Sequence, residues 1–220
     1  MTVRRTEEWW RSRVFTGWRS DPYAYAWERD GEVRGYVVYT IEDGDDGKTF
    51  RVRDRAWTDE EAYLNVLRFV HNHEAQVDSV RWPDPVDTPL LDLVDDPRAV
   101  DVELSTGIMF RVVDVPTTLE RLAYDPAVDA SLVLSVADET ADWNEGTYRL
   151  DVADGTGTVT RTDADVDVHL DVTALSQLVV GYLTPDRAAL LDGVSEMAPG
   201  ARETLAAVFP PAPVFPRDFF

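Results

Sequence analysis

The last twelve residues of the chain, 209–220 (FPPAPVFPRDFF), carry the group best suited to chemistry, the α-carboxylate of Phe220. Four prolines stiffen this segment and its phenylalanines can anchor it, so we expect the terminus to be docked. A desolvated terminal carboxylate has its pKa raised above the ordinary range of about 3.3 to 3.7 and can act as a general base. A hydrophobic clip that closes the domain would use the same residues, and the segment alone leaves both interpretations open.

The three histidines are not spaced as metal ligands. His71 and His73 lie two apart on a predicted helix, about 200° around its axis, so one ion would not contact both. His169 lies in the acidic run 165–171, where alternate Asp and His side chains share one face of a predicted strand. That face could bind a hard cation such as calcium. In so acidic a chain we interpret it as a solvated face, and we assign no metal ligand.

Other catalytic and cofactor signatures are missing from the sequence. The chain contains no cysteine, which excludes disulfides, thiolate metal sites and a cysteine nucleophile. It has no Ser-His-Asp or His-Glu-x-x-His signature, so hydrolase and metalloprotease functions are not favoured. Phosphate binding needs exposed amides at a glycine-rich turn before a helix. Gly35 continues into a predicted strand and residues 44–47 lie in an acidic loop, so we assign no cofactor-binding residue.

The charge balance is strongly acidic, with 42 Asp and Glu against 21 Lys and Arg and with Lys48 as the only lysine. Such a surface repels nucleic acid and anionic membranes, so neither is expected as a partner. The pattern resembles proteins of salt-accumulating, halophilic archaea, in which molar salt shortens the Debye length to about 3 Å and screens the self-repulsion. No signal peptide and no run of about 18 apolar residues is present, so we expect a cytoplasmic protein.

Residues 1–113 are predicted to form an α+β domain. Strands are predicted at residues 23–27, 32–41, 49–57, 79–82, 100–104 and 108–113. Asp30-Gly31 is a strong hairpin signal, so the first three strands are expected to form an antiparallel meander. Thr58 and Glu61 fit a capping box that starts an amphipathic helix ending near Ala75.

Residues 114–220 are predicted to form a second α+β domain. Strands are predicted at residues 131–137, 147–152, 157–162 and 166–172, and helices at 117–124, 173–181, 185–193 and 199–208. Asp154-Gly155 marks a hairpin between the second and third of these strands. Strands followed by helices indicate helices packed on one face of a sheet.

Taken together, these segments resemble the C-terminal two-thirds of the enhanced intracellular survival (Eis) family of N-acetyltransferases. The resemblance covers nearly the whole chain. It is carried by the opening Trp9-Trp10-x-x-x-x-Phe15, YAYAWERDGEVRGYVVY, LLDLVDDPRAV, GIMFRVVDVPTTLERLAY, DVDVHLDVTALSQLVVGYLTP and PAPVFPRDFF. The phrases RVVDVP and PRDFF are the most specific parts.

The resemblance implies a fold and an activity. Residues 1–113 would be a GNAT-like domain, a mixed sheet with helices and no recognisable CoA loop. Residues 114–220 would be a sterol-carrier-protein-2-like (SCP2-like) domain, an antiparallel sheet covered by helices that ends in a docked tail. The family's first region, which binds acetyl-CoA and carries a tyrosine general acid, is expected to be missing.

The activity implied is transfer of acetyl from acetyl-CoA to an amine, with the Phe220 carboxylate as general base. Acetyl-CoA would not be bound by this chain alone. An acetyl-CoA-binding GNAT domain, in the same or another chain, is therefore the expected partner, together with an amine acceptor. The family also forms oligomers, so a homo-oligomer is expected.

A second hypothesis is a non-catalytic binding and oligomerisation module. Its SCP2-like domain would hold a lipid or small apolar ligand between sheet and helices. The side chains expected to line that cavity are Leu175, Leu178, Val179, Tyr182 and Leu190. Ordinary core packing would explain the same five residues. Trp9, Trp10 and Trp18 could lie in an oligomer interface, and burial in the monomer would explain them equally well.

Overall fold

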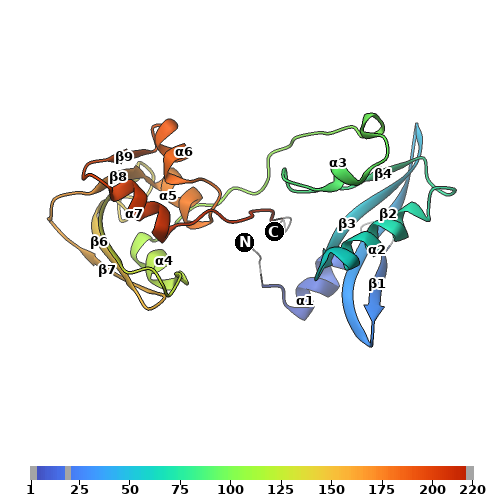
Figure 1. Ribbon diagram of the computed structural model, residues 1–220, viewed down its shortest axis with the longest axis horizontal. Helices are drawn as coiled ribbons and strands as arrows, with labels where there is room; N and C mark the ends of the chain where they lie inside the picture. The colour runs from blue at the N-terminus through green and yellow to red at the C-terminus, as the bar shows by residue number, and fades with distance from the viewer. Residues whose placement is uncertain (1–3, 18–20, 217–220) are drawn as a thin grey trace. The chain divides into compact units, whose positions relative to one another are not determined.

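The computed structural model describes residues 4–17 and 21–216. The chain divides into two compact units, residues 4–100 and 101–216, and each has its own sheet and hydrophobic cluster (Figure 1). Both units combine strands and helices, so the α+β class is confirmed.

The first unit contains a four-stranded sheet of order β1-β2-β3-β4. Its strands are β1 (Tyr23–Arg29), β2 (Glu32–Gly44), β3 (Gly47–Trp57) and β4 (Ser79–Arg81). The first three pair antiparallel, as the meander prediction requires, and β4 pairs parallel to β3. Asp30 and Gly31 have φ values of 55° and 80°, the left-handed conformation that a two-residue hairpin turn needs, so this predicted hairpin is confirmed.

Helix α2 (Glu60–His71) packs on one face of this sheet through the buried side chains of Ala62, Val66 and Val70. Its cap is Asp59, whose carboxylate accepts a hydrogen bond from the Ala62 amide at 2.9 Å. The predicted capping box at Thr58 is therefore wrong by one residue, because Asp59 reaches the third helical amide and Thr58 does not. Gly35 lets α2 approach, since a Cβ there would lie 3.3 Å from Val66.

The chain between the two sheets is largely irregular. Before α4 (Val115–Arg121) it holds only two short helices, α3 (Leu90–Leu93) and η2 (Pro97–Ala99). The strands predicted at 100–104 and 108–113 are wrong, because these described residues form no strand. Alternation marks residues that could line a sheet face, but a strand also needs a partner, and none of the described strands pairs with these residues. Val102, Leu104 and Met109 consequently stay exposed, at 74%, 82% and 94%.

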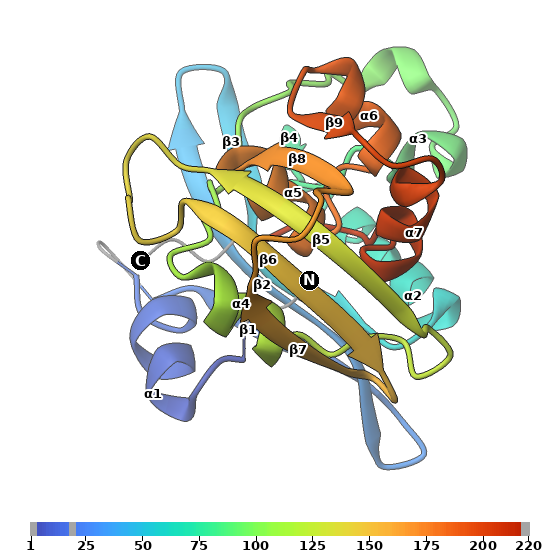
Figure 2. The ribbon, with the colours of Figure 1, turned by 90° about the vertical axis from the view of Figure 1, so that its left-hand side faces the viewer.

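The second unit contains a five-stranded sheet of order β7-β6-β5-β8-β9 (Figure 2). Its strands are β5 (Ala130–Ala137), β6 (Gly146–Ala153), β7 (Thr156–Arg161), β8 (Val168–Asp171) and β9 (Val194–Glu196). All neighbours pair antiparallel except β5 and β8, which are parallel, and β9 was not expected from the sequence. Asp154 and Gly155 have φ values of 51° and 76°, which confirms the predicted hairpin.

Four helices accompany this sheet: α4 (Val115–Arg121), α5 (Val172–Val179), α6 (Pro185–Leu190) and α7 (Ala201–Val208). Helices α4, α5 and α7 lie on the same face of the sheet (Figures 1 and 2). Their side chains Leu119, Leu175 and Leu205 are fully buried in one cluster with Leu134 and Tyr148 of the strands. The predicted arrangement, with helices on one sheet face, is confirmed.

Within the described residues, no helix combines the length and the apolar character needed to span a bilayer.

Candidate functional site

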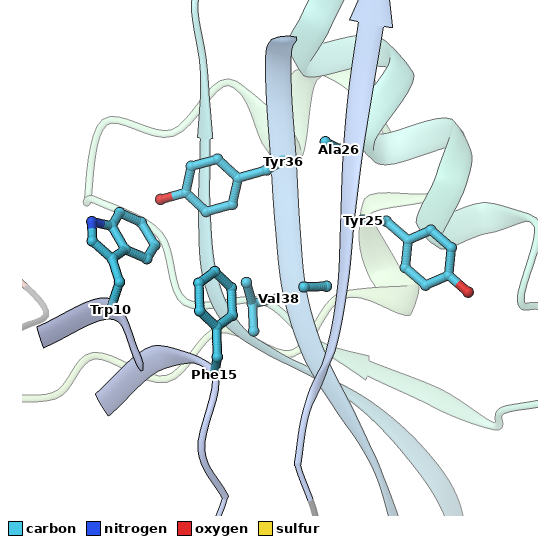
Figure 3. Close-up of a pocket in the computed structure, with 7 residues that line it drawn as sticks. Trp10, Phe15, Tyr25, Ala26, Tyr36 and Val38 are labelled. Atoms are coloured by element: carbon cyan, nitrogen blue, oxygen red, sulfur yellow. The ribbon is translucent and has the colours of Figure 1, made fainter. Parts of the chain in front are cut away.

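An apolar pocket of about 360 Å³ lies in the first unit, on the face of the sheet opposite α2. Its walls are the rings of Trp10, Phe15 and Tyr36, as Figure 3 shows. Trp10 meets Tyr36 edge-on with centroids 5.6 Å apart, and it stacks on Phe15 at 5.7 Å. Three aromatic rings around one hollow form the kind of apolar lining that binds small molecules or partner side chains.

A turn of π-helix positions two of these rings. Helix α1 (Glu7–Trp9) continues into the π-helix η1 (Trp10–Val14), and the Phe15 amide donates to the Trp10 carbonyl at 3.0 Å. This hydrogen bond joins residues five apart, so both side chains come to one side of the turn, whereas an α-helix would rotate them apart. The π turn therefore directs both Trp10 and Phe15 at the sheet.

The floor of the pocket comes from small residues on two strands. Ala24 of β1 pairs with Val38 of β2, and Ala26 pairs with Tyr36. The ring of Tyr25 points away to the other face (Figure 3). The methyl side chains leave the space that the three rings enclose. The alternation of alanine with aromatic residues in 23–27 was a signal for this hollow that our sequence analysis did not use.

Two charged residues lie beside the Trp10 and Tyr36 walls of the pocket. The guanidinium of Arg5 forms an ion pair with Asp54 and lies 4.9 Å from the centroid of the Trp10 ring. Burial, together with the charge of Asp54, raises the pKa of Tyr36 to about 12, so its hydroxyl stays protonated at neutral pH. Asp54 also accepts from the Arg55 amide at 2.9 Å, so it is engaged as a structural acceptor. These contacts favour binding over acid–base catalysis here.

The turn between β3 and α2 is the strand-to-helix junction at which a phosphate group could bind in this unit. It does not fit a pyrophosphate. The Asp59 carboxylate already occupies the amide of Ala62, and Glu60 and Glu61 add two more negative charges to the first turn. The described residues of this turn would repel the phosphates of CoA.

The five expected ligand residues of the second unit are only partly brought together. Leu175 and Leu178 are fully buried in the core, and Val179 packs at its border. Tyr182 and Leu190 are 64% and 83% exposed. The structure therefore does not place these two side chains in a common lining with Leu175 and Leu178.

The start of the C-terminal segment is docked on the second unit. Phe209 is buried, and the Ala212 amide donates to the Gly181 carbonyl at 3.0 Å. Gly181 has a φ of 78°, and a Cβ there would lie 2.7 Å from Ala212, so the two backbones are in close contact. Phe220, the expected general base, lies outside the described residues, as does Trp18.

The histidines and acidic strand have structural surroundings. His73 lies 3.3 Å from the Tyr39 hydroxyl through Nε2 and 2.9 Å from the Phe69 carbonyl through Nδ1. In the acidic run, Asp167 accepts from the Val133 amide and Asp171 caps α5. The described residues contain no group of three or more His, Asp or Glu placed to hold a metal ion.

A buried carboxylate in the second unit was not found from the sequence. Asp138 accepts hydrogen bonds from Arg111 at 2.5 Å and from the Asn144 amide group at 2.9 Å. The backbone amides of Thr140 and Ala141 add two more. The Asn144 hydrogen bond, followed by these others, lowers the pKa of Asp138 to about 2. Thr140, Ala141 and Asn144 follow Asp138 within six residues and Arg111 precedes it by 27, a combination that no spacing rule marks.

Comparison with known proteins follows the division of the chain. An acetyltransferase (GNAT) domain family matches residues 2–112, and a sterol carrier protein domain family matches residues 115–216. No curated protein matches the chain.

Several solved structures are similar. The GCN5-related N-acetyltransferase of Anabaena variabilis ATCC 29413 is 27% identical with a TM-score of 0.78, over 93% of this chain and 52% of that one. Eis1 of Mycobacterium abscessus is 29% identical with a TM-score of 0.66, over 98% and 56%. A conserved protein of Enterococcus faecalis V583, 23% identical with a TM-score of 0.81 over 94% and 52%, shares the fold.

This chain spans about half the length of the structures it matches. The GNAT family match covers half of the chain itself, and the sterol carrier match follows directly after it. The protein belongs to the GNAT acetyltransferase domain family, with a sterol carrier protein domain joined after the GNAT domain.

Proposed function

We propose that this chain is the accessory, C-terminal portion of an Eis-like N-acetyltransferase that transfers acetyl from acetyl-CoA to amines. Residues 1–113 would form the GNAT-like domain and residues 114–220 the SCP2-like domain. The observation that carries the proposal is the order of the two family matches in a chain that aligns with about half of N-acetyltransferase structures.

Acetyl-CoA is assigned to a separate GNAT domain, in the same or another chain. The support is the acidic turn at the start of α2, where Asp59, Glu60 and Glu61 are unsuited to phosphates. In the reaction, the role of this chain would be to shape the site that binds the acceptor amine. It would form a lid or a platform for that site.

The Phe220 carboxylate is proposed as the general base. An acceptor amine is protonated at neutral pH and must lose a proton before it can attack a carbonyl. A carboxylate beside it attracts the ammonium and then takes that proton. The net charge of −21 would favour polycationic amines.

A non-catalytic module that binds a lipid or small apolar ligand is the second candidate. The observation in its favour is the exposed apolar surface at Tyr182, Leu190 and Leu191, the last of which is 65% exposed. Lipid that stays with the protein through purification in high salt, detected by mass spectrometry of an organic extract, would support it.

The deciding experiment is thiol release from acetyl-CoA in molar KCl with polyamine and aminoglycoside acceptors. The protein is assayed alone and with a cofactor-binding GNAT domain of the Eis family added as a separate chain, each with and without deletion of Phe220. We expect turnover only in the mixture, and a loss of at least about 100-fold on deletion, the scale of general base catalysis. Equal turnover by the added domain alone would refute the accessory role.

A further inference from the structure

Strand β1 is a free sheet edge of unusual composition. Within the described part of the chain it pairs with β2 alone. All of its residues are exposed except Trp27, which is half-buried. Residues 23–27, YAYAW, contain no charge, in a chain in which 29% of residues are charged. Exposed edges are normally protected by charges, prolines or short length, so an uncharged edge of five residues indicates a surface that pairs with another strand.

The other three sheet edges differ from β1 in length or in side-chain type. Strands β4 and β9 have three residues each, too short for a useful ladder. Strand β7, with the sequence TGTVTR, is longer but has no aromatic residue. Among the edges of the described sheets, β1 therefore combines length with exposed aromatic side chains.

The sequence of β1 is symmetric about Tyr25. Aromatic residues stand at 23, 25 and 27 and alanines at 24 and 26. Tyr23 and Tyr25, 56% and 52% exposed, lie on the α2 face beside Tyr39 and Phe69. The two alanines lie on the opposite face, in the floor of the aromatic pocket.

We infer that β1 pairs antiparallel with β1 of a second copy of this chain, with Tyr25 on the two-fold axis. In this register Tyr23 faces Trp27 and Ala24 faces Ala26 of the other copy. Aromatic residues thus meet aromatic residues on one face, a favourable cross-strand pairing. On the other face the two alanine floors join, and the two aromatic pockets become one hollow lined by both copies.

The regular part of this ladder is short, because Arg29 lies beyond an irregularity in β1 and its guanidinium pairs with Glu61 of the same chain. A bulge between Trp27 and Glu28 bends the strand there and limits the close ladder to residues 23–27. Self-pairing is isologous and closed, as a symmetric dimer requires.

The inference names a surface for the homo-oligomer expected from the sequence and does not depend on acetyl transfer. Each copy carries a net charge of −21, so association brings two strongly acidic bodies together. Molar KCl shortens the Debye length to about 3 Å and removes most of this repulsion. The dimer should therefore be tighter in molar KCl than in dilute buffer.

The first test is sedimentation equilibrium of the whole protein in molar KCl with Tyr25→Glu and Tyr25→Arg variants. Wild type should sediment at twice the chain mass of 24.8 kDa. Each variant places like charges face to face on the axis and should weaken association roughly tenfold or more. An equimolar mixture of the two variants should regain the dimer, because opposite charges then face each other, and this recovery also shows that both variants fold.

A cross-linking test fixes the register. The chain has no cysteine, so Tyr25→Cys introduces a single thiol on the axis. Directly opposed residues of antiparallel strands have Cα atoms about 4.5 to 5.5 Å apart, within the range that a disulfide spans. Oxidation should cross-link Tyr25→Cys at least about tenfold faster than Val33→Cys, a residue that is 59% exposed but lies on β2 inside the sheet.

Three results would overturn the inference. One is a wild-type monomer at about 100 µM in molar KCl, which would assign the edge to a different partner. The second is that both charged variants remain dimers. The third is that both variants become monomers and their equimolar mixture does not form the dimer again. None of these results bears on thiol release, so the acetyltransferase proposal would stand or fall separately.

Discussion

The Asp138 carboxylate fixes the irregular residues that precede α4. It holds Arg111 directly and holds Asn144, whose side chain accepts from the Val115 amide at 3.0 Å. The Ser176 hydroxyl likewise accepts from the Val112 amide at 2.8 Å. The amides of Val112 and Val115, which have no sheet to pair in, are thus satisfied by two polar side chains, as buried polar groups must be.

This arrangement predicts a pH dependence of stability. The folded pKa of Asp138, about 2, lies below the ordinary value of 3.8, so the folded state binds fewer protons between these pH values. Its contribution to the free energy of unfolding is complete above about pH 4 and is lost as the pH falls to about 2. Asp138→Asn should lower stability at pH 7, and the gap to wild type should shrink as acid is added.

Urea unfolding from pH 7 to the lowest pH at which both proteins fold measures that gap. Asp142→Asn, at an exposed position of the same loop, is the matched control and should leave stability nearly unchanged. A gap between wild type and Asp138→Asn that stays constant with pH would contradict the assignment.

At the scale of elements, α4 packs against β7 because β7 has a glycine at the contact. A Cβ at Gly157 would lie 2.7 Å from Tyr124 and 3.0 Å from the Leu119 carbonyl. The Tyr124 hydroxyl donates to that same carbonyl at 2.7 Å, so neither neighbour is free to move. Helix α4, the first helix of the second unit, can therefore pack against β7 only because position 157 has no side chain.

Gly157→Ala should lower the free energy of unfolding by about 1 to 3 kcal/mol, the usual cost of overpacking. Thermal or urea unfolding of the whole protein measures it. Gly107→Ala serves as the control, because nothing lies within 4 Å of a Cβ there, and it should change stability by no more than about 0.5 kcal/mol. Similar losses at the two glycines would mean that backbone freedom, and not the α4 contact, sets the cost.

Elements that depend on neighbouring residues in the sequence could be predicted. Elements that depend on pairing with a distant segment could not. The Asp30-Gly31 and Asp154-Gly155 hairpins follow from the turn residues themselves. The strands expected at 100–104 and 108–113 failed because alternation does not supply a partner, and β9 was missed because its three residues are strand only beside β8.

The aromatic pocket shows the same limit for a site. Trp10 and Tyr36 are far apart in sequence, and the π turn that aims Trp10 at the sheet has no known spacing rule. The five residues expected to line a ligand cavity in the second unit include both core side chains and exposed ones. Helical periodicity identifies an apolar face, but it does not show whether a cavity remains beneath that face.

For the whole molecule, the dominant physical quantity is the net charge of −21. Ion pairs such as Arg55 with Asp84 and Arg34 with Asp59 use part of the available cations, and the excess carboxylates repel one another across the surface. The guanidinium of Arg55 also lies 5.2 and 4.4 Å from the ring centroids of Trp57 and Trp82, so this cation is held by packing as well as by charge.

Stability should therefore rise with KCl. We expect the melting temperature to increase by at least about 5 °C between about 0.1 M and about 2 M KCl, because screening removes the self-repulsion of the folded state. Differential scanning calorimetry measures it. An uncharged osmolyte at equal osmolality should give a smaller rise, and equal stability in dilute buffer and molar KCl would contradict a salt-adapted surface.

The exposed stretch at residues 101–110 has one more consequence. It contributes no strand, and the two hydrophobic clusters lie wholly before it or begin after it, at Val112. An endoprotease that cut the chain there would break no ladder and open neither core. Such a nick would leave two folded fragments. A denaturing gel would then show that the chain is cut, while a spectroscopic measurement of folding would show no loss of structure.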